Sequence, residues 1–143
     1  MTLPKRFGIW GNTDKFSFWD ALPKIISWSK KNDLEVHLTS RILNHTNGTK
    51  LEEKEIKAKG DMSKLDFMLV LGGDGTFLSL ARTIENSTIP ILGIHLGDLG
   101  FLAKVTLKDL FYRLDRVAMG SYQLEERILV EATVEQNGKK INQ

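Results

Sequence analysis

Short apolar runs alternate with amphipathic stretches along most of this chain. Residues 6–10, 34–38, 65–71 and 89–94 have the length and side-chain pattern of buried strands. Polar or glycine-containing turns follow these runs, and longer stretches of helical spacing separate several of them. Strands that alternate with helices favour a parallel sheet. The pattern therefore predicts an α/β fold: a mostly parallel sheet with flanking helices.

The first helical stretch contains a proline. Apolar side chains recur at helical spacing over residues 22–26, and Pro23 falls among them. If Asp20 is the N-cap, Pro23 lies in the first turn, where a backbone N–H would be unpaired in any case. If the helix begins earlier, at Ser17, Pro23 lies inside it and kinks it. The sequence leaves both starts open.

A second helix is predicted from Thr76 onward. Its apolar side chains recur at i, i+3, i+4 and i+7. The buried stripe consists of Phe77, Leu80, Ala81 and Ile84. Leu78 lies off that stripe, which leaves it free to face a ligand instead of the core.

A third helix is predicted after Thr106. Thr106 and Asp109 have the spacing of a capping box. The apolar positions that follow are Leu107, Leu110, Phe111, Leu114, Val117 and Ala118. Gly120 has the position of a residue that ends this helix.

Two regions depart from the strand–helix alternation. Asn44, Asn47 and Gly48 indicate a loop, and the charged residues 51–59 predict at best a weakly packed surface helix. Residues 127–134 alternate at period two, and Asn137-Gly138 is a strong hairpin turn. We therefore expect an α/β domain over residues 1–120 and the beginning of an antiparallel, β-rich domain over residues 121–143.

Composition narrows the functional classes. The 143 residues are 41% hydrophobic and 27% charged, as in an ordinary soluble globular domain. A net charge of +2 suits small anionic molecules and gives no reason to expect a nucleic-acid partner. The absence of cysteine excludes disulfides, thiolate metal sites and a cysteine nucleophile. With no signal peptide and no apolar run of ~18 residues, we expect a cytoplasmic protein with no membrane partner.

The turn Gly72-Gly73-Asp74-Gly75-Thr76 directly follows a predicted buried strand. Glycines let the backbone approach a ligand closely, and N–H groups at the start of the next helix point toward an anion. The turn carries an acid and no lysine. Because a carboxylate repels phosphate, Asp74 should remove a proton from an attacking hydroxyl or hold Mg²⁺. A plain tight turn is the alternative, but the flanking strand and helix favour phosphoryl transfer to an alcohol.

A second glycine-rich stretch, Gly-Ile-His-Leu-Gly-Asp-Leu-Gly-Phe-Leu, covers residues 93–102. It follows the fourth predicted strand and so belongs to the same edge of the sheet. Phe101 can pack on the core or contact a flat ring, and taken alone it favours the core. Asp98 faces solvent or a ligand, and the sequence does not decide between them.

Together these two stretches resemble the NAD kinase family, which phosphorylates the 2′-hydroxyl of the adenosine ribose of NAD to give NADP. That family shows a Gly-Gly-Asp-Gly-Thr turn and then a Gly-Ile-Asn-x-Gly-x-Leu-Gly-Phe-Leu segment. Here His95 stands where asparagine is usual. Glu125-Glu126-Arg127 also resembles the family's entry into its β-rich domain. The resemblance covers residues 65–134.

The resemblance implies roles for particular residues. Asp74 is expected to accept the proton of the ribose hydroxyl, and glycines at Gly72, Gly73 and Gly75 to shape the phosphate-facing turn. The residues expected to lie against NAD are Asp74, Gly75, Leu78 and Phe101. The implied substrates are NAD and either ATP or polyphosphate, with Mg²⁺ or another divalent cation; no metal ligand is assigned. The full-length protein is expected to be a homo-oligomer.

Other functions remain open from the sequence. Lipid and sugar kinases of the same superfamily share a similar Gly-Gly-Asp-Gly turn, although a lipid kinase should expose an apolar stretch that this chain lacks. A nucleotide-binding module without catalysis is the third alternative. The family has an Asn-Glu or Asn-Asp pair after the hairpin, and the chain stops at Gln143, about where that pair should begin. We therefore expect residues 1–143 alone to bind NAD weakly and not to phosphorylate it.

Overall fold

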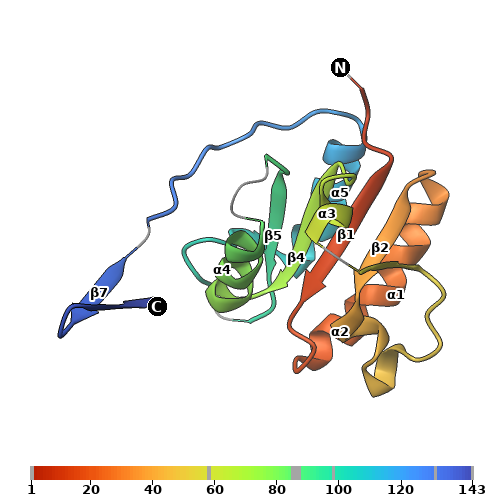
Figure 1. Cartoon of the computed structure of the whole chain (residues 1–143). Coiled ribbons are helices and arrows are strands. Elements are labelled where there is room, and N and C mark those ends of the chain that lie inside the picture. Colours follow the sequence, from red (N-terminus) through yellow and green to blue (C-terminus); the bar gives the residue numbers. More distant parts are fainter. Residues whose placement is uncertain (1, 58, 85–87, 98, 131, 143) are drawn as a thin grey trace.

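The fold is a six-stranded parallel sheet with helices on both faces (Figure 1). The computed structural model describes residues 2–57, 59–84, 88–97, 99–130 and 132–142. The strand order is β3-β2-β1-β4-β5-β6, and each neighbouring pair is parallel. The strands are β1 Arg6–Gly11, β2 Glu35–Thr39, β3 Lys54–Ile56, β4 Phe67–Gly72, β5 Ile91–His95 and β6 Val105–Thr106. The predicted α/β fold with a mostly parallel sheet is confirmed.

Each face of the sheet has its own apolar core. On one face α1 (Phe16–Lys31) and α5 (Leu110–Ala118) bury side chains that include Phe18, Leu22, Ile25, Leu110 and Leu114. On the other face α3 (Lys59–Met62) and α4 (Asp74–Thr83) contribute Met62 and Leu80. Alternate residues of β4 serve the two cores: Phe67, Leu69 and Leu71 the first, Met68 and Val70 the second. Since both faces are covered, β4 is a continuous apolar run and is buried along its whole length.

The direction of winding reverses between two central strands. From β1 the chain proceeds outward to β2 and β3, and from β4 it proceeds the opposite way to β5 and β6. The carboxyl ends of β1 and β4 therefore flank a topological switch point, the place where open α/β sheets bind ligands. The Gly72–Thr76 turn lies at this point, because it begins at the last residue of β4.

One predicted element was wrong. Residues 51–59, expected to form a weak surface helix at best, contain the edge strand β3, and α3 begins only at Lys59. β3 pairs with β2 in the register His37↔Lys54. Lys54 and Glu55 are exposed and Ile56 is buried. Charged side chains are common on edge strands, where they discourage pairing with other chains. Here they leave too few apolar positions for the alternating pattern of a strand to be recognised.

The ends of the helices settle two open points. α1 begins at Phe16 with Lys15 as N-cap, so the earlier start is correct and Pro23 lies inside the helix. Before α5, Thr106 Oγ1 donates to Asp109 Oδ2 at 3.3 Å and a 3₁₀ turn intervenes, so the expected capping box is not formed in its usual way. Gly120 ends α5 as predicted, with φ +73°. Its N–H and that of Ser121 bond back to carbonyls of the last turn at 3.0 and 2.9 Å, as in a Schellman motif.

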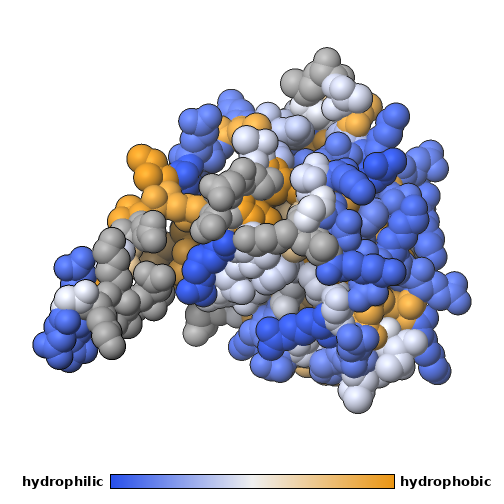
Figure 2. Space-filling view, viewed as in Figure 1, coloured by the Kyte–Doolittle hydropathy of each residue, from blue (hydrophilic) through white to orange (hydrophobic). Residues whose placement is uncertain are grey.

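After α5 the chain extends away from the sheet to a small hairpin (Figure 1). β7 (Thr133–Gln136) and β8 (Lys139–Asn142) pair antiparallel across Asn137-Gly138. The strand expected from residue 127 was too long: residues 121–130 are neither helix nor strand and all are exposed, because no strand among the described residues lies beside them. Figure 2 shows apolar side chains along this segment, and its exposed members include Leu124, Ile128, Leu129 and Val130. Whether the hairpin begins a β-rich domain stays a prediction.

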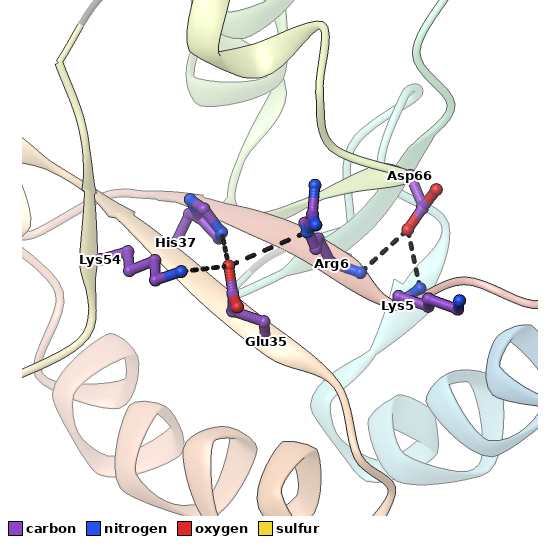
Figure 3. A network of polar contacts seen from close by, with 6 residues as sticks. All are labelled: Lys5, Arg6, Glu35, His37, Lys54 and Asp66. Carbon is purple, nitrogen blue, oxygen red and sulfur yellow. Dashed lines mark hydrogen bonds and ion pairs between the residues drawn. The ribbon is translucent and has the colours of Figure 1, made fainter.

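A cluster of charged side chains ties the amino ends of the strands together (Figure 3). Glu35 Oε1 lies 2.6 Å from His37 Nε2, 3.2 Å from Lys54 Nζ and 4.0 Å from Arg6 Nε. The hydrogen bonds from His37 and then Lys54 lower the pKa of Glu35. This cluster joins β1, β2 and β3 at the edge of the sheet opposite the Gly72–Thr76 turn. We therefore assign it a structural role, apart from the site.

Candidate functional site

The Gly72–Thr76 turn joins β4 directly to α4. Gly73 is the N-cap of α4, with extended backbone at φ −110° and ψ −165° and no side-chain cap. A Cβ on Gly72 would lie 2.5 Å from Thr76 Oγ1, so glycine is required there for Thr76 to fold back over the strand end. A Cβ on Gly73 or Gly75 would meet no atom within 4 Å. These two glycines therefore leave open space outside the turn, as a phosphate-facing surface requires.

Asp74 links the two glycine-rich stretches. Its Oδ2 accepts a hydrogen bond from Phe101 N–H at 3.0 Å, and its Oδ1 accepts one from Leu102 N–H at 3.1 Å. A Cβ on Gly100 would overlap the same carboxylate, which explains a glycine at that position. The N–H groups of Phe101 and then Leu102 lower the pKa of Asp74. Residues far apart in sequence thus meet at one carboxylate, which stays ionised at neutral pH.

The start of α4 offers backbone donors beside that carboxylate. The first helical bond runs from Phe77 N–H to Gly73 C=O at 3.1 Å. The N–H groups of the three preceding residues have no carbonyl one turn earlier to bond to. Such groups, with the positive end of the helix dipole, favour anions. Because the Asp74 side chain bonds to the neighbouring loop and does not cap the helix, it leaves these donors unblocked.

Exposed apolar side chains lie on α4 and on the loop that bonds to Asp74. Leu78 is 44% exposed, as its position off the buried stripe predicted, and Leu99 is 72% exposed. Phe101 is 87% exposed, so of its two possible roles packing in the core is excluded. The exposed ring of a residue whose backbone N–H bonds to Asp74 is free to stack on a planar group. Asp98, the other residue left open, lies outside the described residues.

The sequence analysis did not assign two neighbours of the turn to the site: the loop after β1 and His95. The loop after β1 lies across the switch point, where Asn12 N–H donates to Leu71 C=O at 2.8 Å, and it contains the buried Thr13. The signal was available in Gly11-Asn12 following a strand, together with the rule for open sheets. His95, singled out only as a departure from the family pattern, pairs with Gly72 in the register of β4 and β5.

No protein-only metal centre is evident in the described part of the chain, where no group of three or more His, Cys, Asp or Glu could hold an ion. Mg²⁺ commonly uses one or two carboxylates and the phosphates of a nucleotide, and so needs no such cluster. Within the same residues, no helix has both the length and the apolar character to cross a membrane.

Comparison with known proteins places the chain in a family. The family model described as ATP-NAD kinase N-terminal domain matches residues 22–122. The chain belongs to the NAD kinase family. Among its relatives, the NAD kinase of Marinomonas sp. (strain MWYL1) is 34% identical over 139 residues, which cover 97% of this chain and 47% of that protein. The NAD kinase of Hydrogenovibrio crunogenus is 35% identical over 136 residues, covering 95% of this chain and 47% of the relative.

The chain therefore spans about half the length of the NAD kinases it matches. A crystal structure of yeast NADH kinase complexed with NADH has the same fold, with a TM-score of 0.73 and 18% identity. The alignment covers 85% of this chain and 38% of the yeast one. Of the families left open by the sequence, NAD kinase is thus confirmed over the lipid and sugar kinases.

Proposed function

We propose that this chain supplies the Gly-Gly-Asp-Gly-Thr half of a NAD kinase site, which transfers a phosphoryl group to the 2′-hydroxyl of the adenosine ribose of NAD. The observation that carries the proposal is the meeting of both glycine-rich stretches at Asp74. Family membership supports the substrate, since the matching relatives are NAD kinases. ATP or polyphosphate is the proposed donor.

Asp74 is the proposed proton acceptor. A base must be ionised before the reaction, and the two loop N–H groups keep the pKa of Asp74 below its ordinary value. A carboxylate has about four acceptor sites, so two N–H bonds leave room for the ribose hydroxyl. Removing that proton as the oxygen attacks prevents positive charge from building on it. General-base assistance of this kind contributes roughly 10²–10⁴-fold in rate.

The phosphate side of the site is proposed to lie over Gly73 and Gly75. The open space above these glycines and the free N–H groups of the first turn of α4 support this assignment. Mg²⁺ or another divalent cation, carried by the donor's phosphates, would neutralise charge on the transferred group. The chain's own part is to place Asp74 beside the acceptor hydroxyl and the start of α4 beside the donor phosphate.

The acceptor nucleotide is proposed to contact Asp74, Gly75, Leu78 and Phe101. Phe101 bonds to Asp74 through its backbone N–H, and its ring is exposed, which supports stacking of the ring on the dinucleotide. A domain boundary after residue 120 is also proposed, supported by the end of α5 at Gly120 and the exposed segment beyond it. A cytoplasmic location and a homo-oligomeric full-length protein belong to the same proposal and rest on the family.

The test is formation of NADP by the purified protein supplied with NAD, Mg²⁺ and either ATP or polyphosphate. We expect NADP to appear with at least one donor when the protein assayed is as long as the NAD kinase relatives. Phosphorylation of a diacylglycerol or of fructose 6-phosphate, with none of NAD, would contradict the proposal. Saturable binding of NAD without turnover in a chain as long as the relatives would instead favour the non-catalytic module.

A further inference from the structure

The loop between β5 and β6 is packed at its ends and exposed in its middle. Leu96 and Ala103 are 7% and 1% exposed, whereas Leu99 and Phe101 are 72% and 87% exposed. Burial of its own apolar side chains therefore does not fix the middle of this loop. Hydrogen bonds must do so. Among the described residues, the side chains that bond to the backbone of this loop are Asp74 and His95.

His95 is the side chain that begins the loop. It is 9% exposed, and its Nδ1 lies 3.1 Å from the carbonyl oxygen of Gly97. Because a carbonyl only accepts, Nδ1 must carry the proton of this bond. Nε2 is buried and has no hydrogen-bond partner among the described residues. The imidazole thus makes its one polar contact within the loop through Nδ1.

The position of His95 couples this bond to the Gly72–Thr76 turn. His95 lies beside Gly72 in the sheet, and Leu96 N–H bonds to Gly72 C=O at 3.0 Å. Gly97 has nothing within 4 Å of where a Cβ would be, so no neighbour packs against it there. A few residues later the same loop donates two N–H groups to Asp74. Hydrogen bonds weaken steeply when their angle is lost, so the path of the loop between these points matters.

We propose that His95 is a positioning residue, whose Nδ1–H bond to Gly97 C=O sets the turn that delivers the N–H groups of Phe101 and Leu102 to Asp74. Through that turn it places both the carboxylate and the exposed Phe101 ring. The relevance of this placement to the acceptor nucleotide rests on the proposed function. The positioning itself does not, and it is measurable without catalysis.

The test compares His95→Asn with His95→Gln. The amide nitrogen of asparagine reaches the place of imidazole Nδ1, whereas that of glutamine reaches the place of Nε2. Asparagine should therefore keep the bond to Gly97 and glutamine should lose it. The readout is hydrogen exchange of the Phe101 and Leu102 amides, followed by NMR. We expect exchange to rise about five- to tenfold in His95→Gln, as for loss of one net hydrogen bond, and to stay near the wild-type rate in His95→Asn.

Buried amides of β4, such as that of Leu69, are the internal control and should exchange equally in all three proteins. Asp74→Asn is the positive control, because it weakens the acceptor of the same two N–H groups. Unchanged protection in His95→Gln, or equal loss of protection in both variants, would overturn the proposal.

A second measurement requires no substitution. The ¹⁵N shifts of the His95 ring in the wild-type protein should show the proton on Nδ1, and a proton on Nε2 alone would also overturn the proposal. If His95→Gln lowers kcat/KM for NAD and His95→Asn keeps it near the wild-type value, the placement of Asp74 and Phe101 by His95 matters for catalysis. These kinetics need a protein as long as the NAD kinase relatives. Absence of NADP formation in every variant of that length would count against the proposed function and leave the exchange result standing.

Discussion

At the scale of single residues, the site depends on how one carboxylate is held. Asp74 accepts hydrogen bonds from two backbone N–H groups of a loop, the nearer of which, that of Phe101, is 27 residues away in sequence. The same bonds that orient the carboxylate also lower its pKa. A weakly basic carboxylate takes the proton of an attacking hydroxyl late, after bonding to phosphorus has made that hydroxyl more acidic. If Asp74 is the base, we therefore expect its orientation to contribute more than its basicity.

Asp74→Asn should remove the proposed base while keeping nearly the same side-chain shape. In a catalytically complete enzyme we expect kcat to fall by roughly 10²–10⁴ and the affinity for NAD to change less, because general-base catalysis supplies about that factor. Steady-state kinetics and calorimetric titration with NAD measure the two quantities. Asp66→Asn is a matched control, since Asp66 likewise accepts two backbone N–H groups, from Lys5 and Arg6, but at the opposite end of the sheet. A kcat for Asp74→Asn within a few-fold of wild type would show that Asp74 is not the base.

The glycines of the turn should differ in their tolerance of a side chain. Gly72→Ala forces a methyl group against Thr76, and overpacking of this kind costs about 1–3 kcal/mol. Gly73→Ala meets open space at a negative φ and should change the free energy of unfolding little. Urea denaturation of the two variants checks the order. Equal stabilities would mean that Thr76 moves aside at no cost and that Gly72 is not required for packing.

At the scale of elements, what the sequence predicted depended on burial. β4 was predicted because both of its faces are covered, which leaves an unbroken apolar run. β3 was missed because an edge strand of three residues is too short to show alternation among exposed charges. Asp74 and the glycines of its turn were found because a local string carries them, whereas the contact of Asp74 with Phe101 needed the register of β4 and β5. No local pattern encodes a contact between loops of two strands.

The charged cluster on the amino ends of β1, β2 and β3 should give a small, pH-dependent stabilisation. Because the pKa of Glu35 is lowered in the folded protein, its contribution is present above the ordinary value of 4.5 and is lost as the pH falls through the lowered value. Glu35→Gln should therefore destabilise at pH 7, and the difference from wild type should vanish in acid. The side chain is 38% exposed, so we expect no more than about 1 kcal/mol.

Urea denaturation of wild type and Glu35→Gln across this pH range is the measurement. Glu125→Gln is the control, because the Glu125–Arg127 pair lies on the exposed segment after α5 and should not affect unfolding. A difference between wild type and Glu35→Gln that grows toward low pH would have the wrong sign and would contradict the assignment.

At the scale of the whole molecule, the described structure holds one wall of the proposed site. The turn, the proposed base Asp74 and the exposed Phe101 ring belong to the α/β part, and the matched NAD kinases are about twice as long as this chain. The segment from residue 121 to 130 leads away from that wall with its apolar side chains exposed (Figure 2). Exposed apolar side chains of this kind favour association, with another part of the same protein or with another copy of it.

We therefore predict that residues 1–143 by themselves bind NAD weakly, form no measurable NADP and self-associate. Phosphoryl transfer depends on aligning acceptor and donor, and the described residues supply contacts on only one side of the proposed site. Calorimetry with NAD, an NADP assay with ATP and Mg²⁺, and sedimentation over a range of concentrations measure the three properties. Charged substitutions at the exposed Ile128 and Val130 should reduce self-association without changing NAD affinity, because neither residue lies in the Asp74 loop contacts. Turnover comparable to that of full-length relatives would show instead that the α/β part aligns both substrates on its own.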